Sequence, residues 1–324
     1  MLASLKISIA MCTYNGEKYL QEQLDSFLQQ TRLPDELVVC DDGSQDETVF
    51  LLRAFASEAP FPVHIHLNPQ NLGFVKNFEK ASCFCQGDII AFADQDDVWL
   101  PHKLAEIERL FKEDPQVGCV FSNSTLVDEH LKPLGYSHWD LLGFTSRLHE
   151  SFIQGDTLGL WLEKNYVSGA GMAFRANLRD LVLPIPTYWI HDHWISFVIR
   201  VFMKTAIIQD HLYKYRLHSS QLIGAKAIKL RDKWGTLFKM PHKDFKPNIV
   251  RLYAALLCLL SDSRLNNKPL IEYIEDKIEH CNVRDHMPNS ILQRFPLVVR
   301  EFFTGRYHRY SYGWKSVAKD LFLS

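Results

Sequence analysis

An apolar run that ends at a cluster of carboxylates constrains this chain more than any other feature of its sequence. Ile89 to Ala93 is a short, uninterrupted apolar stretch of the kind made by a strand buried in a parallel sheet. Asp94, Asp96 and Asp97 follow it within four residues. Open α/β sheets bind ligands beyond the carboxyl ends of their strands. The run therefore predicts a central strand with an acidic site at its end, although a capped, solvated turn has the same composition.

Strands and helices alternate along the first hundred residues. The apolar patterns predict strands over residues 7–12, 36–40, 63–67 and 89–93, and helices over residues 17–30, 48–57 and 74–84. Such alternation is typical of a parallel sheet flanked by helices. Polar residues follow the first two strands as well: Thr13 to Asn15 follow the first, and Asp41 and Asp42 the second. Together with Asp94 to Asp97, we expect these three polar clusters to converge on one crevice. Neither GxGxxG after the first strand nor GxxxxGK[ST] occurs, which argues against a dinucleotide dehydrogenase or a P-loop NTPase.

Composition places limits on the partners of the chain. The net charge of −2 argues against nucleic-acid binding, yet residues 226–324 hold 18 Lys and Arg against 10 Asp and Glu, while the first 225 residues hold 18 against 28. The seven cysteines form no CxxC pair and no zinc spacing, as expected of buried thiols in a reducing compartment. The first predicted strand leaves no room for a signal peptide, and the apolar run 252–260 is too short to cross a bilayer. We expect a cytoplasmic protein, soluble or peripheral on a membrane.

Four motifs in the first hundred residues resemble the nucleotide-sugar half of family 2 glycosyltransferases. They are Thr13-Tyr14-Asn15, Asp41-Asp42-Gly43-Ser44, Asn71-x-Gly73 with Asn77, and Asp94-Gln95-Asp96-Asp97-x-Trp99. The last of these motifs is similar to the one found in the subgroup that includes bacterial rhamnosyltransferases for surface polysaccharides. The resemblance implies an inverting enzyme of the GT-A fold that needs a divalent metal, Mn2+ or Mg2+. It also implies that the nucleotide and donor sugar contact Thr13, Tyr14, Asn15, Asp41, Asp42, Asn71, Gly73, Asn77, Asp94 and Gln95.

Two later segments extend the resemblance towards the reacting sugar. Gly169 and Ala170 resemble the glycine-containing loop beside the donor sugar, although small residues there also suit a tight bulge. Asp192, before an aromatic stretch, matches the position of the catalytic base, with Trp194 as a face for the sugar ring. A carboxylate at a helix start also serves as a cap, and His191 and His193 are alternative bases.

A third segment completes the predicted metal site. Tyr215-Arg216-Leu217-His218 resembles the family's Tyr-Arg-x-His, in which the histidine joins the metal and diphosphate site. We therefore predict metal ligation by Asp96, Asp97 and His218, with the choice between the two carboxylates left open.

These observations divide the chain into two predicted regions. Residues 1–225 are expected to form the catalytic domain, with a nucleotide-sugar half to about residue 100 and an acceptor half after it. Residues 226–324 are expected to be mostly helical. The stretch from Phe295 to Lys315 interleaves basic and aromatic residues, which suits the inner leaflet of a membrane or packing on the catalytic domain.

The predicted activity is transfer of a sugar from a UDP- or dTDP-activated donor, such as dTDP-rhamnose, to a saccharide or lipid-linked oligosaccharide. A nucleotidyltransferase is an alternative, but Thr13 to Gly16 lacks the cation that would hold a triphosphate. A non-catalytic sugar-binding protein with a decayed site is the second alternative.

Overall fold

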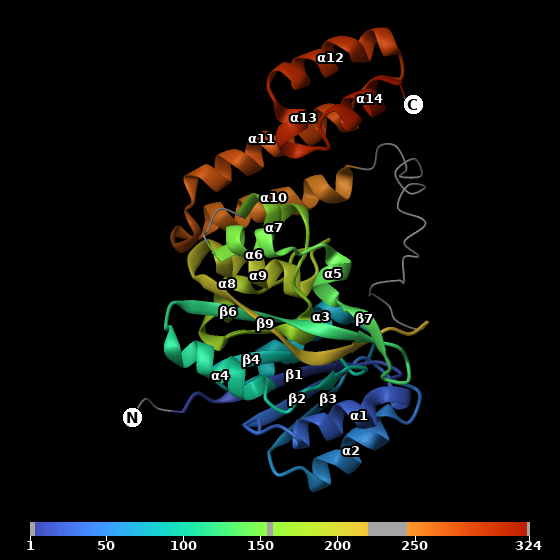
Figure 1. The fold of residues 1–324 in the computed structure, drawn as a ribbon, viewed down its shortest axis with the longest axis vertical. Coiled ribbons are helices and arrows are strands. Elements are labelled where there is room, and N and C mark those ends of the chain that lie inside the picture. The colour runs from blue at the N-terminus through green and yellow to red at the C-terminus, as the bar shows by residue number, and fades with distance from the viewer. Residues whose placement is uncertain (1–3, 154–157, 220–244, 323–324) are drawn as a thin grey trace. The chain divides into compact units, whose positions relative to one another are not determined.

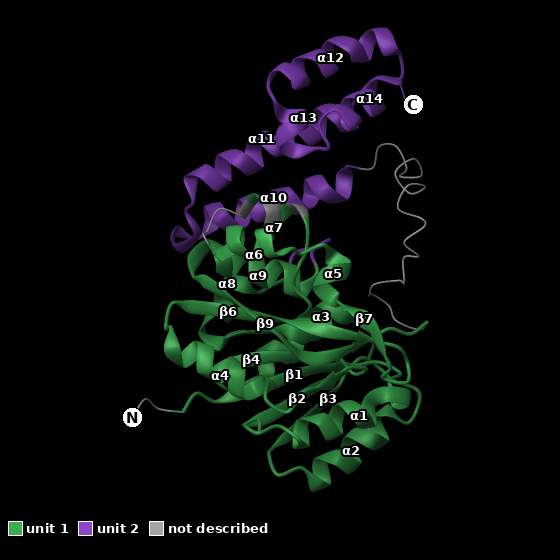
Figure 2. Cartoon of the chain, in the orientation of Figure 1, with its two compact units in different colours: residues 1–185, 190–227 green, residues 186–189, 228–324 purple. Residues whose placement is uncertain are grey.

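The computed structural model describes residues 4–153, 158–219 and 245–322. The chain divides into two compact units, residues 1–185 with 190–227 and residues 186–189 with 228–324 (Figure 2). The boundary that the sequence predicts near residue 225 lies outside the described residues, so that division remains a prediction.

The first unit is built on a mixed sheet (Figure 1). Within the described residues, its nine strands have the order β3-β2-β1-β4-β8-β6-β9-β5, and β7 pairs with β6. Strands β1 to β4 are mutually parallel, whereas β8 runs antiparallel to both β4 and β6. The strands are β1 Ile7–Thr13, β2 Glu36–Asp41, β3 Val63–Leu67, β4 Ile89–Ala93, β5 Val98–Trp99, β6 Val117–Val127, β7 Pro133–Ser137, β8 Met172–Arg175 and β9 Lys204–Arg216.

Helices cover both faces of the parallel half, because alternate strand residues point to opposite faces. Ile9, Met11 and Ala91 pack in one core with α1 Glu17–Leu28, α2 Thr48–Glu58 and α4 Lys103–Glu113. Phe92 lies on the other face, 5.1 Å between ring centroids from Phe78 of α3 Phe74–Phe84 and 5.3 Å from His191 of α9 His191–Phe202. Shorter helices are α5 His138–Leu142, α6 Ser146–Ile153, α7 Leu158–Glu163 and α8 Arg179–Val182.

The strand register brings the predicted polar clusters to one edge of the sheet. Thr13 is the direct neighbour of Asp41, and Met11 is the neighbour of Ala93, so β1, β2 and β4 end together. Because β8 is antiparallel to β4, the segment that enters β8 also lies at this edge, with Ala173 opposite Ala91. The expected crevice therefore receives both the strand ends and the segment before β8.

The second unit is helical, as the sequence predicts. Its helices are α10 Lys246–Ser261, α11 Lys268–Asp285, α12 Ile291–Phe303, α13 Arg306–Tyr310 and α14 Trp314–Phe322. Among the residues described in either unit, no helix has both the length and the apolar character needed to span a membrane. The predicted α/β sheet with flanking helices and a helical C-terminal region is confirmed.

Candidate active site

Asp41, at the end of β2, organises the loop that follows it. Its carboxylate accepts hydrogen bonds from Thr13 Oγ1 at 2.8 Å, from the Ser44 backbone N–H at 2.9 Å and from Ser44 Oγ at 2.5 Å. Asp41 and Thr13 are almost completely buried. Asp41 therefore joins β1 to the Gly43–Ser44 turn, and in this structure its oxygens are used within the protein.

Asp42 organises a second loop, which carries the predicted residues Asn71 and Gly73 and leads into α3 with Asn77. Its carboxylate accepts from the Gly73 N–H at 2.9 Å and from Asn68 Nδ2 at 2.8 Å, and Asn68 Nδ2 also donates to Asn77 Oδ1 at 2.8 Å. Asn71 Nδ2 donates to the Asp42 carbonyl at 3.1 Å. Gly73 has φ of 79° and ψ of 150°, a conformation that only glycine adopts readily.

Gln95 connects the end of β4 to the end of β1. Its side chain accepts from the Tyr14 N–H at 2.8 Å and donates to the Tyr14 carbonyl at 3.1 Å. Asn15, with φ of 47°, accepts from the Gln45 N–H at 2.8 Å. Tyr14 is 40% exposed, so this pairing fixes the backbone beneath an exposed aromatic ring at this edge of the sheet.

The carboxylates after β4 differ in their surroundings. Asp94 is partly exposed, and burial, followed by the negative charges of Asp96 and Asp192, raises the pKa of its carboxyl group. Asp96 is also partly exposed, and its Oδ2 lies 2.8 Å from His218 Nε2. The structure thus brings Asp94 and Asp96 together with Asp192 and His218, which follow them by about a hundred residues in the chain.

Asp97 faces the interior of the first unit. It is 1% exposed, its Oδ1 accepts from the Arg216 N–H at 3.1 Å, and its Oδ2 is buried with no hydrogen-bond partner among the described residues. Burial and the charges of Asp96 and Asp94 raise the pKa of the Asp97 carboxyl group well above its usual range. The carboxyl group of Asp97 is therefore enclosed by the protein, and its ligation of a metal stays a prediction.

Two of the predicted metal ligands, Asp96 and His218, lie together. The described residues contain no group of three or more His, Cys, Asp or Glu side chains that could hold a metal ion. Asp96 and His218 supply one carboxylate and one imidazole side by side. This pair fits Mg2+ or Mn2+, which often take one or two protein ligands and complete their coordination with water and substrate phosphates.

Asp192 lies in the first turn of α9 and is 7% exposed. Its Oδ1 accepts from Asn165 Nδ2 at 2.9 Å and from the His193 N–H at 2.6 Å. Burial raises the pKa of Asp192 to about 6, while the hydrogen bonds that it accepts lower this pKa because they stabilise the charged form. A carboxylate poised near neutral pH beside Asp94 has the properties of a general base.

The two alternative bases, His191 and His193, are occupied by packing or hydrogen bonding. His191 is stacked on Phe78 with ring centroids 4.2 Å apart, and burial lowers the pKa of its imidazole to about 3. His193 Nε2 is hydrogen-bonded to the Trp161 carbonyl. Both imidazoles are therefore engaged in contacts within the protein.

The glycines before β8 are required by the protein's own packing. A Cβ at Gly169 would lie 2.6 Å from His191 Nε2, and one at Gly171 would lie 3.0 Å from the Ser122 carbonyl. The Gly169–Gly171 segment forms a 3-10 turn, and the side chain of Ala170 is fully buried. This turn therefore approaches α9 closely, next to Asp192.

The Trp194 ring, predicted as a face for the sugar, is buried in this structure. Its indole is 2% exposed and donates from Nε1 to the Val182 carbonyl at 2.8 Å. The ring fills the space between α8 and α9, so packing accounts for it in this structure.

Sequence reasoning missed two residues that support the site. Lys103 is fully buried, is hydrogen-bonded to the Ala170 carbonyl, and has Nζ 3.6 Å from the centre of the Trp99 ring. Its signal was a lysine in the apolar stripe that continues with Ile107 and Phe111 of α4. Asn165, which holds Asp192, follows no strand and belongs to no motif, so only the fold reveals it.

Comparison with known proteins agrees with this architecture. The chain is 30% identical over 260 residues to the UDP-Glc:alpha-D-GlcNAc-diphosphoundecaprenol beta-1,3-glucosyltransferase WfgD of Escherichia coli, covering 77% of this chain and 90% of that protein. It is 28% identical over 219 residues to an uncharacterized glycosyltransferase of Nostoc sp., covering 67% of this chain and 66% of that protein. The match therefore spans slightly less than two thirds of the Nostoc relative.

Structural comparison identifies the fold. The S. aureus TarS structure in complex with UDP-GlcNAc superposes with a TM-score of 0.61 at 14% identity, covering 97% of this chain and 91% of that one. This likeness confirms the expected GT-A fold, whereas the rhamnosyltransferase subgroup stays a prediction. The model of glycosyl transferase family 2 matches residues 8–177, more than half of the chain. The chain therefore belongs to glycosyl transferase family 2.

Proposed function

We propose that this protein transfers a sugar from a nucleotide-activated donor to an acceptor hydroxyl, with inversion at the anomeric carbon. The observation that carries the proposal is the position of Asp192. A buried carboxylate with a pKa of about 6 lies close enough to Asp94 to raise the pKa of that group, at the carboxyl end of the central strand. Two carboxyl groups with different surroundings at one strand end suit separate roles in acid–base chemistry and donor binding.

The donor would bind along the edge formed by β1, β2 and β4. Thr13, Asp41 and Asp42 act by holding the two loops in shape, since their polar groups are already paired within the protein. Tyr14 offers an exposed ring for a nucleobase, and Asp94 offers an oxygen for a sugar or ribose hydroxyl.

Asp96 and His218 would hold the divalent ion. When bound, this ion supplies Lewis-acid stabilisation of the negative charge on the diphosphate leaving group. Asp192 takes the proton from the acceptor hydroxyl while the acceptor oxygen forms its bond to the anomeric carbon. The bond from that carbon to the diphosphate breaks on the opposite side, and the nucleoside diphosphate leaves.

A UDP-sugar is the donor that we favour over dTDP-rhamnose, and a lipid-linked saccharide is the favoured acceptor. Both follow from WfgD, whose name gives UDP-glucose as donor and an N-acetylglucosamine on diphosphoundecaprenol as acceptor. An acceptor of this kind would place the reaction at the inner face of the membrane.

Donor binding and turnover test the proposal. The purified protein is mixed with UDP-glucose, UDP-galactose, UDP-N-acetylhexosamines, GDP-mannose and dTDP-rhamnose, with Mn2+ or with EDTA, and binding and donor hydrolysis are measured. We expect metal-dependent binding of one UDP-sugar, and Asp192→Asn to keep that binding while losing turnover. Asp210→Asn, at an exposed position of β9, is the matched control. Absence of binding to every nucleotide sugar would overturn the proposal.

A further inference from the structure

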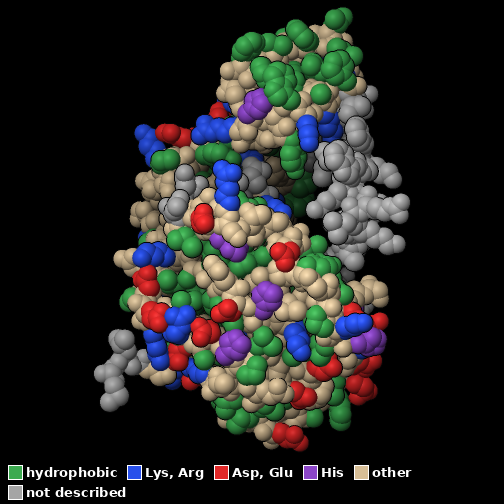
Figure 3. Space-filling model, viewed as in Figure 1, with side chains coloured by type: hydrophobic (Ala, Val, Ile, Leu, Met, Phe, Trp, Pro, Cys, Tyr) green, Lys and Arg blue, Asp and Glu red, His purple; other side chains and the backbone are tan. Residues whose placement is uncertain are grey.

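Helices α12 to α14 expose an unusual number of large apolar side chains. Six of them are between 56% and 86% exposed, and together they define what we call the α12–α14 surface: Leu292, Phe295, Phe303, Tyr312, Trp314 and Phe322. The helices that carry them are in contact, since the ring of Phe302 lies 4.4 Å from that of Trp314. Figure 3 shows apolar side chains gathered over this part of the second unit. Monomeric soluble proteins seldom expose apolar patches of this kind without a partner.

Buried charged and polar pairs join these helices to α11, beside a small apolar core that includes Val298 and Val317. His280 Nδ1 lies 2.7 Å from Glu301 Oε2, Arg284 Nε donates to Asp320 Oδ2 at 2.7 Å, and the Tyr307 hydroxyl donates to the same oxygen at 2.8 Å. Helices of soluble proteins normally bury their apolar face and expose their charges. Here charged pairs join the helices, while much of the apolar surface faces outwards.

The charge at this surface is positive. Between Ile291 and Phe322 the chain has six Lys and Arg residues and two acidic residues. Both acids, Glu301 and Asp320, are buried. Lys315 is exposed and Lys319 partly exposed, one turn apart on α14. Arg300 and Arg306 pair with acidic residues of α11, so the positive charge that this surface offers to a partner comes mainly from these two lysines.

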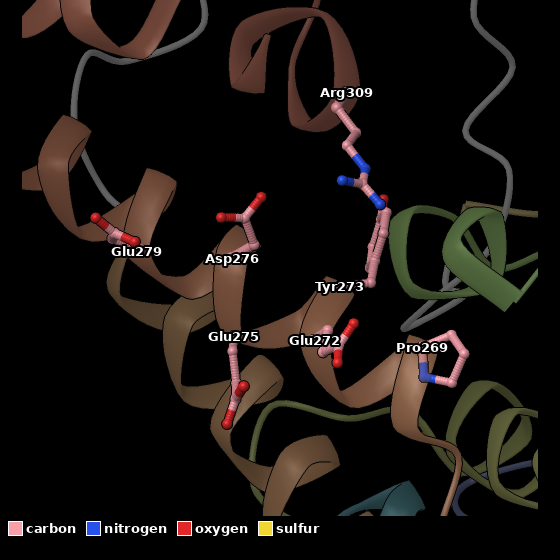
Figure 4. Close-up of a pocket in the computed structure, with 7 residues that line it drawn as sticks. All are labelled: Pro269, Glu272, Tyr273, Glu275, Asp276, Glu279 and Arg309. Carbon is pink, nitrogen blue, oxygen red and sulfur yellow. The ribbon is translucent and has the colours of Figure 1, made fainter. Parts of the chain in front are cut away.

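Helix α11 carries the opposite charge. A groove of about 490 Å³ in the second unit is lined by Glu272, Glu275, Asp276 and Glu279 of α11, with Arg309 reaching into it from α13 (Figure 4). The second unit is thus acidic along α11, where Arg300 and Arg306 offset part of the charge, and basic at Lys315 and Lys319 of the apolar α12–α14 surface. An anionic surface would attract the second side and repel the first.

We propose that the α12–α14 surface docks on a membrane that contains anionic lipids. Exposed Trp, Tyr and Phe side chains suit the boundary between headgroups and acyl chains, and basic side chains suit anionic headgroups. A second copy of the chain fits less well, because pairing this surface with itself would bring Lys315 and Lys319 against the same charges. The inference uses the second unit alone and does not depend on the proposed sugar transfer.

Vesicle flotation of the full-length protein tests the docking. Vesicles of phosphatidylcholine are compared with vesicles that also contain phosphatidylglycerol. We expect binding to the anionic vesicles, a decrease as salt is raised, and weak binding to the neutral ones. The double variant Phe303→Ser/Trp314→Ser should bind about a hundredfold more weakly, since each aromatic side chain contributes roughly tenfold. The double variant Lys315→Gln/Lys319→Gln should lose binding to a smaller degree, about fivefold for each charge removed.

Phe50→Ser is the matched control, because Phe50 is 66% exposed on α2 in the first unit, against 65% for Trp314. It should bind vesicles like the unchanged protein, and thermal unfolding should show that all variants are folded. Equal binding to neutral and anionic vesicles, or unchanged binding of Phe303→Ser/Trp314→Ser, would overturn the proposal. So would a dimer in light scattering that this double variant dissociates, since the occupant would then be a second copy.

Discussion

The titration of Asp192 gives the sharpest test of its role. A base with a pKa of about 6 is roughly nine-tenths ionised at pH 7 and about one-tenth ionised at pH 5. Only the ionised form accepts a proton, so kcat/KM for sugar transfer should fall about tenfold between pH 8 and pH 5, with a midpoint near pH 6. A carboxylate at its ordinary value of 3.8 would leave the rate almost unchanged over that range.

Asn165 allows the titration to be assigned to Asp192. Its amide donates to Asp192 at 2.9 Å and stabilises the charged carboxylate, so Asn165→Ala should raise the midpoint. A hydrogen bond to a charged group contributes about 1.5 kcal/mol or more, which corresponds to an increase of about one pH unit. Asp94 also titrates in this region, but Asn165 is hydrogen-bonded to Asp192, so the shift separates the two carboxyl groups.

Transfer rates would be measured from pH 5 to pH 8 on the unchanged protein, Asn165→Ala, Asp192→Asn and the control Asp210→Asn. Asp192→Asn should lose about 10²- to 10⁴-fold in kcat and keep its affinity for the donor. A pH profile that is flat down to pH 5, or a midpoint that Asn165→Ala leaves in place, would refute the assignment of Asp192 as the base.

Three further predictions concern the other parts of the site. In calorimetry, Asp96→Ala should lose Mn2+-dependent donor binding while Asp97→Asn keeps it, because only Asp96 is both partly exposed and paired with a histidine; loss in both variants would contradict this reading. Gly169→Ala should lower the free energy of unfolding in urea by about 1–3 kcal/mol, because the added methyl group collides with the His191 ring. In the His191→Ala background the same substitution should cost much less, and an equal cost in both backgrounds would contradict the proposed collision. Asp41→Asn should cost about 1.5–3 kcal/mol in urea, since an amide cannot accept every hydrogen bond that the carboxylate accepts; a cost below about 0.5 kcal/mol would show that the loop does not need the charge.

The fold of the parallel half could be predicted closely from the sequence. The strands at 63–67 and 89–93 and the helix at 74–84 have the predicted bounds, and the other early elements differ by one or two residues. Local periodicity determines these elements, because each helix or strand must bury one face regardless of what lies beyond it. The same reasoning explains why Asp94 could be placed at the end of a buried strand.

The tertiary structure decided what each acidic residue can do. Asp96 and Asp97 are adjacent in sequence and chemically identical, yet one meets His218 and the other turns inwards towards the Arg216 backbone, more than a hundred residues away. Likewise Asn165 reaches Asp192 only because β8 pairs antiparallel with β4 and returns the chain to the edge of the sheet.

The sequence by itself determined the α/β class, the family, the acidic end of β4 and the helical character of the C-terminal region, because local patterns and short motifs specify these features. The tertiary structure decided the burial of Asp97 and Lys103, the hydrogen bond that holds Asp192, and the outward direction of the aromatic side chains on α12 to α14. Those features depend on which distant segments pack together, and burial of this kind sets both the charge of a carboxyl group and the face that a helix presents to its partner.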